Sequence, residues 1–256
     1  MLGMGKVDAS TGERLGEVVI EPRYNGPVES ANGGYACGCL AAFLDEPAEI
    51  TLRLPPPLAR PLAVVFDGAA GVRMLDGEQR VAEGRRATLD AIEPPVRPSF
   101  DEATAASARH VGRGMRHLLS DCFVCSPYRE AAGDGLGVCP GPLDADASVN
   151  AAPFQPDASL ADDGVVRHEV IWAALDCPSY PPSLWANSPE LWASGRIALL
   201  GRLAAERRRE VEVGERLVLV GWLLSHEGRK HHTASALLDG DGEVVAGALA
   251  TWIELR

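Results

Sequence analysis

The pattern of apolar and polar positions divides the chain into two segments with the same order of predicted elements. In the first segment, residues 17–24 have the alternation of a short strand, and a loop rich in Gly, Pro and Asn follows. Residues 34–44 are small and apolar on all sides, which predicts a buried helix. Strand patterns then follow at 49–54, 62–66, 72–75 and 79–88.

The second segment repeats this order of elements. Strand-like stretches at 136–139 and 165–170 lead into the apolar run 171–176, which ends before Pro178. The turn at 239–242 predicts that the last two strands form a hairpin. Each segment is thus predicted to contain one helix covered by an antiparallel sheet, which is an α+β architecture. The repeated order of elements indicates an internal duplication. The strands of this segment are predicted at 197–205, 210–213, 216–224, 233–238 and 243–255.

The predicted boundary between the segments is a proline-rich stretch at 92–98. Residues 101–119 follow with Ala, Arg and His and with no helix breaker before Gly112, so we expect an interdomain helix there. A chain of 256 residues accommodates two domains of about 120–130 residues each. The predicted units are an N-terminal domain at 1–98, a linker helix at 99–119 and a C-terminal domain at 120–256.

Charge and hydropathy narrow the possible partners. The net charge of −12 argues against binding to nucleic acid or to an anionic membrane, because the phosphates would repel the chain. No stretch approaches the roughly 18 apolar residues that a membrane helix needs. The first six residues are too few and too polar for a signal peptide, so we expect a cytoplasmic protein. Basic residues at 207–209 and 229–230 are candidates to contact a phosphorylated cofactor.

Six cysteines lie along the chain, and we expect free thiols. The spacing of Cys122 and Cys125 is that of half a metal or redox site. Zinc needs about four ligands, and Cys139 is the one evident candidate for a third. We therefore expect buried structural thiols, with no metal and no cofactor.

Several motifs resemble those of one protein family. The sequence Cys-Phe-Val-Cys-Ser-Pro at 122–127, followed by Gly-Leu at 135–136, resembles the opening of many hot-dog thioesterases of the phenylacetyl-CoA type. Residues 172–178 resemble the start of that family's central helix, and the Asn-Gly-Gly-Tyr motif at 32–35 resembles the turn that opens the same helix. The back strands are matched at 213–222 and 246–253, and the similarity covers most of 17–66 and 120–256.

The resemblance implies two tandem hot-dog domains packed as a pseudo-dimer within one chain, each a central helix wrapped by an antiparallel sheet. It also implies hydrolysis of an acyl-CoA or acyl-carrier thioester. In the family, backbone N–H groups at a helix start bind the thioester carbonyl, and an acid on the facing helix activates water or attacks. Such a double hot-dog is expected to be a monomer or a homodimer.

The resemblance assigns one composite site. The family's acid lies eight residues after the first glycine of the turn, and this position holds Ala41 in the first half and Asp176 in the second. The second half has no glycine at the matching turn, residues 167–169. We therefore predict Asp176 as the catalytic acid and Gly33 and Gly34 as oxyanion donors. The competing interpretations are a plain glycine turn and a capping aspartate.

Other residues are assigned more loosely. Asn32 belongs to the same turn, and Asn25 lies one residue from the place where the family carries a polar side chain toward the carbonyl. Ser179 and Ser183 follow Asp176 and are candidates to orient water.

Two alternative functions stay open. Each half lacks one part of the site, which also fits a non-hydrolytic protein that binds acyl thioesters or acyl chains. The spacing of Asp163 and His168 matches that of enoyl-CoA hydratases of the hot-dog type, although the usual Asn-Pro between them is absent.

Overall fold

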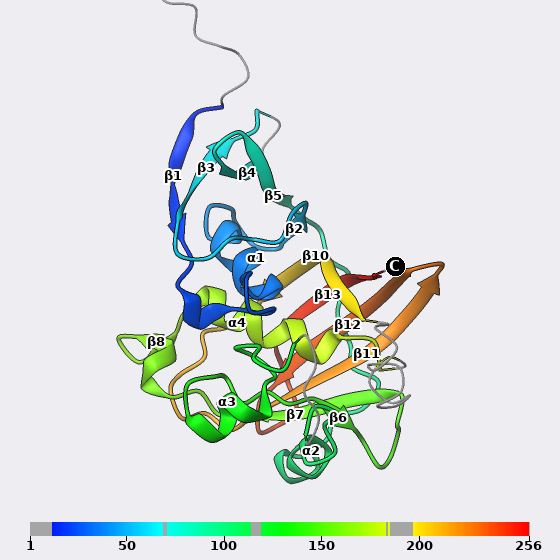
Figure 1. The fold of residues 1–256 in the computed structure, drawn as a ribbon. Coiled ribbons are helices and arrows are strands. Elements are labelled where there is room, and N and C mark those ends of the chain that lie inside the picture. The colour runs from blue at the N-terminus through cyan, green and yellow to red at the C-terminus, as the bar shows by residue number, and fades with distance from the viewer. Residues whose placement is uncertain (1–11, 69–70, 114–118, 183, 185–196, 256) are drawn as a thin grey trace, which may run out of the picture.

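One antiparallel sheet of eleven strands extends through the protein (Figure 1). The computed structural model describes residues 12–68, 71–113, 119–182, 184 and 197–255. A separate two-stranded sheet is formed by β8 (Ala161–Asp162) and β9 (Val165–Val166). The first part of the large sheet contains β1 (Arg14–Val19), β2 (Ala48–Leu52), β3 (Pro61–Phe66), β4 (Gly71–Asp76) and β5 (Gln79–Arg86). The second part contains β6 (Gly141–Pro142), β7 (Val149–Phe154), β10 (Ala198–Arg207), β11 (Leu217–Glu227), β12 (Lys230–Leu238) and β13 (Val244–Glu254).

The two parts of the sheet repeat one strand order about a seam. The spatial order is β1-β3-β4-β5-β2 and then β10-β13-β12-β11-β7-β6, and β2 pairs with β10 at the seam. On each side the strand that follows the helix lies at the seam, and the last strand lies beside it. Strands β2 to β5 therefore correspond to β10 to β13, and β1 corresponds to β7.

Two nine-residue helices, α1 (Gly33–Ala41) and α4 (His168–Asp176), pack against each other beside this sheet (Figure 1). They run antiparallel, because Gly34 lies against Asp176 and Gly38 lies against Glu169. A Cβ atom on Gly34 would come within 2.6 Å of the Trp172 carbonyl oxygen. Glycine at this position therefore allows the helix backbones to approach closely.

A third helix, α2 (Phe100–Ser107), covers the opposite face of the second part of the sheet. Side chains of β11 alternate between two cores: Leu217 and Leu219 belong to the main core, whereas Val218 and Val220 pack with Ala103 and Ala106 of α2. Successive strand residues point to opposite faces, so both faces of this part are covered. A capping box formed by Ser99 and Glu102 fixes the start of α2.

Both predicted buried helices are confirmed, and so is the predicted hairpin β12–β13. Strands β4 and β5 form a second hairpin. Three short helical segments add to them: η1 (Pro22–Tyr24), α3 (Pro127–Ala132) and η2 (Ala158–Leu160). A fourth, η3 (Cys177–Ser179), follows α4 directly. None of the helices in the described ranges has the length and apolar character needed to cross a membrane.

Other predicted elements were wrong. The expected helix 101–119 ends at Ser107, and His110 beyond it donates from Nδ1 to the Pro140 carbonyl at 2.7 Å. Residues 136–139 form no strand, and the corresponding strand is β7. Residues 210–213 contribute an isolated bridge, in which Glu212 pairs with Val165. The predicted strand 17–24 ends at Val19.

Candidate active site

The site is built around the first turn of α1. Asn32 is the N-cap, and its Oδ1 accepts a hydrogen bond of 2.9 Å from the Tyr35 amide. Asn is among the preferred N-cap residues because this contact satisfies one of the free amides of the first turn. The turn thus presents the Gly34 amide to Asp176 at the end of α4.

Asp176, the last residue of α4, lies against this turn. Its Oδ2 accepts hydrogen bonds from the Gly34 amide at 2.9 Å and from Asn32 Nδ2 at 2.8 Å. The residue is only 2% exposed, and its Oδ1 is buried without a hydrogen-bond partner in the part of the chain described. One carboxylate oxygen is therefore held in place, and the other is not held by any described residue.

The surroundings of Asp176 make its carboxylate a stronger base. Burial raises the pKa of Asp176 to about 7, although the hydrogen bond from Gly34 acts in the opposite direction. The nearby Cys122 also raises this pKa, and the bond from Asn32 lowers it. A carboxylate with a pKa near neutrality is suited to general base catalysis at physiological pH.

Asp176, Asn32 and Gly33 lie at the wall of a cavity of about 320 Å³. Arg53 and Arg229 contribute cationic groups to the same wall. A cavity of this size with mostly apolar walls and a few polar groups is typical of small-molecule sites. The main apolar side chains around the cavity are Leu52, Leu54, Leu199, Leu200, Tyr180 and Trp252.

The two predicted oxyanion donors differ in their contacts. The Gly34 amide is bonded to Asp176. The Gly33 amide finds no acceptor among the described residues, and Gly33 lines the cavity. An amide in the first turn of a helix carries the positive end of the helix dipole, so Gly33 is the better placed of the two to bind a developing oxyanion.

Asn25 is placed away from this group. Its Nδ2 donates to the Asp121 carbonyl at 2.9 Å, and its Oδ1 accepts from Arg129 Nη1 at 2.6 Å. Asn25 is not among the cavity-lining residues of the described chain. These contacts connect the loop before α1 to Asp121 and to α3.

Ser179 lies close to Asp176 but contacts its backbone. The hydroxyl donates to the Asp176 carbonyl at 2.6 Å and accepts from Trp252 Nε1 at 3.0 Å, and the side chain is fully buried. Ser183 lies outside the described residues.

We predict that Ser179→Ala destabilises the protein by about 1–3 kcal/mol, because it leaves the buried Trp252 N–H without an acceptor. Urea unfolding followed by Trp fluorescence measures this change. Turnover per folded molecule should stay within a few-fold of wild type, and Ser159→Ala, which removes an exposed hydroxyl, serves as the control. A loss of turnover without a loss of stability would instead indicate that Ser179 acts on water.

The opposite end of the α1–α4 pair carries different groups. Ala41 occupies the position that corresponds to Asp176, and His168 begins α4 where glycine begins α1. Glu46 accepts from Trp172 Nε1 at 2.7 Å, and its Oε1 lies 3.6 Å from His168 Nδ1. His168 is thus paired with Glu46, whereas Asp163 is exposed in the turn between β8 and β9. Asp163 and His168 therefore do not form the Asp–His pair that the hydratase interpretation requires.

Comparisons with known proteins support the fold assignment. No family model matches the chain, and no curated protein matches its sequence. The solved TesB protein of Mycobacterium avium subsp. paratuberculosis is 12% identical, with a TM-score of 0.57 over 95% of this chain and 96% of that one. Acyl-CoA thioesterase II TesB2 of Mycobacterium marinum is 15% identical, with a TM-score of 0.55 over 94% of this chain and 92% of that one. The chain therefore has the fold of the hot-dog acyl-CoA thioesterases.

Proposed function

We propose that this protein hydrolyses an acyl thioester, carried by CoA or by an acyl-carrier protein. The observation that carries the proposal is the Asp176 carboxylate at the cavity: Gly34 and Asn32 fix one oxygen, and the other oxygen is buried with no partner among the described residues. The structural neighbours named as acyl-CoA thioesterases support the same reaction class.

The proposed reaction uses the two ends of the helices together. Asp176 Oδ1 takes a proton from water, and the water oxygen attacks the thioester carbonyl carbon. The negative charge on the carbonyl oxygen is stabilised by the Gly33 amide. The C–S bond then breaks, and the thiolate takes the proton from the Asp176 carboxyl, which leaves a free acid and a thiol. A direct attack by Asp176, through an anhydride that water hydrolyses, uses the same placement.

We further propose that residues 1–98 and 120–256 are two hot-dog units that form a pseudo-dimer. The repeated strand order about the β2–β10 seam and the antiparallel pair of nine-residue helices support this division. Residues 99–119 connect the units, and α2 within them packs on the second unit. One end of the helix pair then holds the active site, and the other end is inactive.

A second candidate is a binding protein that keeps the acyl cavity without turnover. The observation that favours it is the burial of Asp176, which is 2% exposed and accepts a hydrogen bond from the Gly34 amide. In this case Asp176 would serve to hold the two helices together.

The deciding experiment measures thiol release from short, medium, long and aromatic acyl-CoAs, and from matching acyl-carrier thioesters. Binding of non-hydrolysable thioether analogues is measured in parallel by calorimetry. Turnover with at least one acyl class supports the hydrolase and names its substrate. Tight analogue binding without turnover on any substrate would reject the hydrolase in favour of the binding protein. Hydration of an enoyl-CoA, monitored through the loss of enoyl absorbance, would instead support the hydratase alternative.

A further inference from the structure

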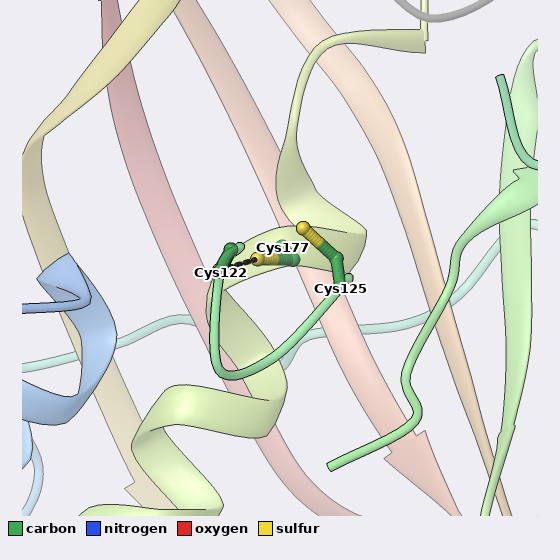
Figure 2. Close-up of side chains that lie close together, drawn as sticks. All are labelled: Cys122, Cys125 and Cys177. Carbon is green, nitrogen blue, oxygen red and sulfur yellow. Dashed lines mark hydrogen bonds between the residues drawn. The ribbon is translucent and has the colours of Figure 1, made fainter. Parts of the chain in front are cut away.

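Three buried cysteines converge at the end of α4. Cys122 and Cys125 lie in the loop before α3, and Cys177 begins η3, directly after Asp176. Figure 2 shows their side chains turned toward one another from these two segments. All three sulfur atoms lie within 4.8 Å of one another, and the Cys122 and Cys177 sulfurs are 3.9 Å apart.

The spacing fits shared coordination of one metal ion. Thiolates that bind zinc at about 2.3 Å in tetrahedral geometry lie about 3.8 Å from one another. The separation of Cys122 and Cys177 is close to this value, and all three residues are free thiols. A disulfide would need a separation of about 2 Å.

The loop that carries Cys122 and Cys125 forms a tight turn that suits metal binding. The Ser126 amide donates to the Cys122 carbonyl at 3.1 Å and closes the turn. Asn32 Nδ2 also donates to the Cys122 sulfur at 3.8 Å. Amide donors directed at a sulfur stabilise a thiolate, which is the form that binds metal.

The cluster also has an open side. Cys122, Cys125 and Cys177 all line the cavity, so an ion can enter from it and a water molecule can complete the coordination. Cys139, the third ligand suggested by the sequence, donates instead to the Cys125 carbonyl at 3.4 Å and lies outside the three-sulfur group.

We propose that Cys122, Cys125 and Cys177 together bind one thiophilic divalent cation of the Zn²⁺ type. Three sulfur ligands favour such soft or borderline ions over Mg²⁺ and Ca²⁺. The ion would connect the 122–125 loop to the end of α4 and so restrain the segment next to Asp176. The proposal does not depend on hydrolysis, because the hydrolytic steps above use no metal.

The test uses the reduced full-length chain after treatment with a chelator. Titration with Zn²⁺ should show one bound equivalent, and Co²⁺ should give thiolate-to-metal charge-transfer bands with the intense visible bands of tetrahedral coordination. Zn²⁺ should also raise the unfolding temperature of the wild type, because it binds the folded state.

Two matched variants locate the site. Cys177→Ala should lose Zn²⁺ affinity by at least 100-fold together with the charge-transfer bands and the thermal shift. Cys37→Ala removes an equally buried thiol of α1 that lies outside the cluster, and it should bind as the wild type does. Thermal unfolding without metal shows that both variants are folded.

Three results would overturn the metal site. They are the absence of a bound equivalent, equal Zn²⁺ affinity of Cys177→Ala and wild type, or a disulfide between two of these cysteines that forms in air in place of metal binding. Zn²⁺ binding is read without substrate, and hydrolysis is read on the chelator-treated chain. The failure of one proposal is therefore distinguishable from the failure of the other.

Discussion

Replacing Asp176 with asparagine is expected to lower kcat for thioester hydrolysis by about 10²–10⁴-fold, the usual contribution of a general acid–base group. Asparagine has the same size and can still accept from Gly34 and Asn32 through its carbonyl oxygen. It cannot take a proton from water. Steady-state thiol release measures the loss, and affinity for a thioether analogue should change little.

The matched control is Asp163→Asn, which makes the same chemical change at an exposed turn. Its left-handed backbone, with φ of 50°, is readily adopted by asparagine. This variant should keep the wild-type rate. A variant Asp176→Asn that keeps full turnover would show that Asp176 has a structural role, and the proposed mechanism would be rejected.

Gly34→Ala is expected to reduce both stability and turnover. The added Cβ would lie 2.5 Å from the Asp176 Cβ and 2.6 Å from the Trp172 carbonyl oxygen, so α1 and α4 must separate. Overpacking of this kind costs about 1–3 kcal/mol or somewhat more. Separation also lengthens the bond from the Gly34 amide to Asp176. Urea unfolding and thiol release on the same preparation measure the two effects.

Gly38→Ala separates these two effects. Its Cβ would lie 2.6 Å from the Glu169 Cα and 2.8 Å from the Trp172 Cβ, one turn farther from the carboxylate. A similar loss of stability is expected, with a smaller loss of turnover per folded molecule. Wild-type stability in both variants would contradict the close approach of the two helices.

The elements that could be predicted from the sequence are those with strong local patterns. The run of small and apolar residues at 34–44 predicted the α1 helix, and the turn at 239–242 predicted the last hairpin. Asp176 was identified by its spacing of eight residues from the start of the corresponding turn. It reaches Gly34 because both helices are nine residues long and antiparallel, so that the end of α4 meets the start of α1.

The errors arise where distant contacts decide the local structure. Residues after Ser107 have the composition of a helix, but the contact between His110 and Pro140 turns the chain there. Strand β7 carries Asn150 and Pro153, which weaken its strand pattern, yet it pairs along its length with β11. Pairing with a neighbouring strand thus outweighs local preference.

The sequence also failed to group Cys177 with the Cys-x-x-Cys pair. These residues are brought together when the 122–125 loop packs on the end of α4, and no local spacing records that contact. The position of Cys177 directly after the predicted acid was the one available indication. Glu46 was missed for the same reason, because its partners Trp172 and His168 lie in the other half.

The unequal ends of the α1–α4 pair have a consequence for the way this protein can evolve. A symmetric dimer has identical residues at both ends of such a pair, because one gene encodes both copies. In a single chain, Ala41 and Asp176 mutate independently of each other. Selection for the proposed turnover can therefore act on the Asp176 end, while the Glu46 end is free to accumulate contacts that serve only packing.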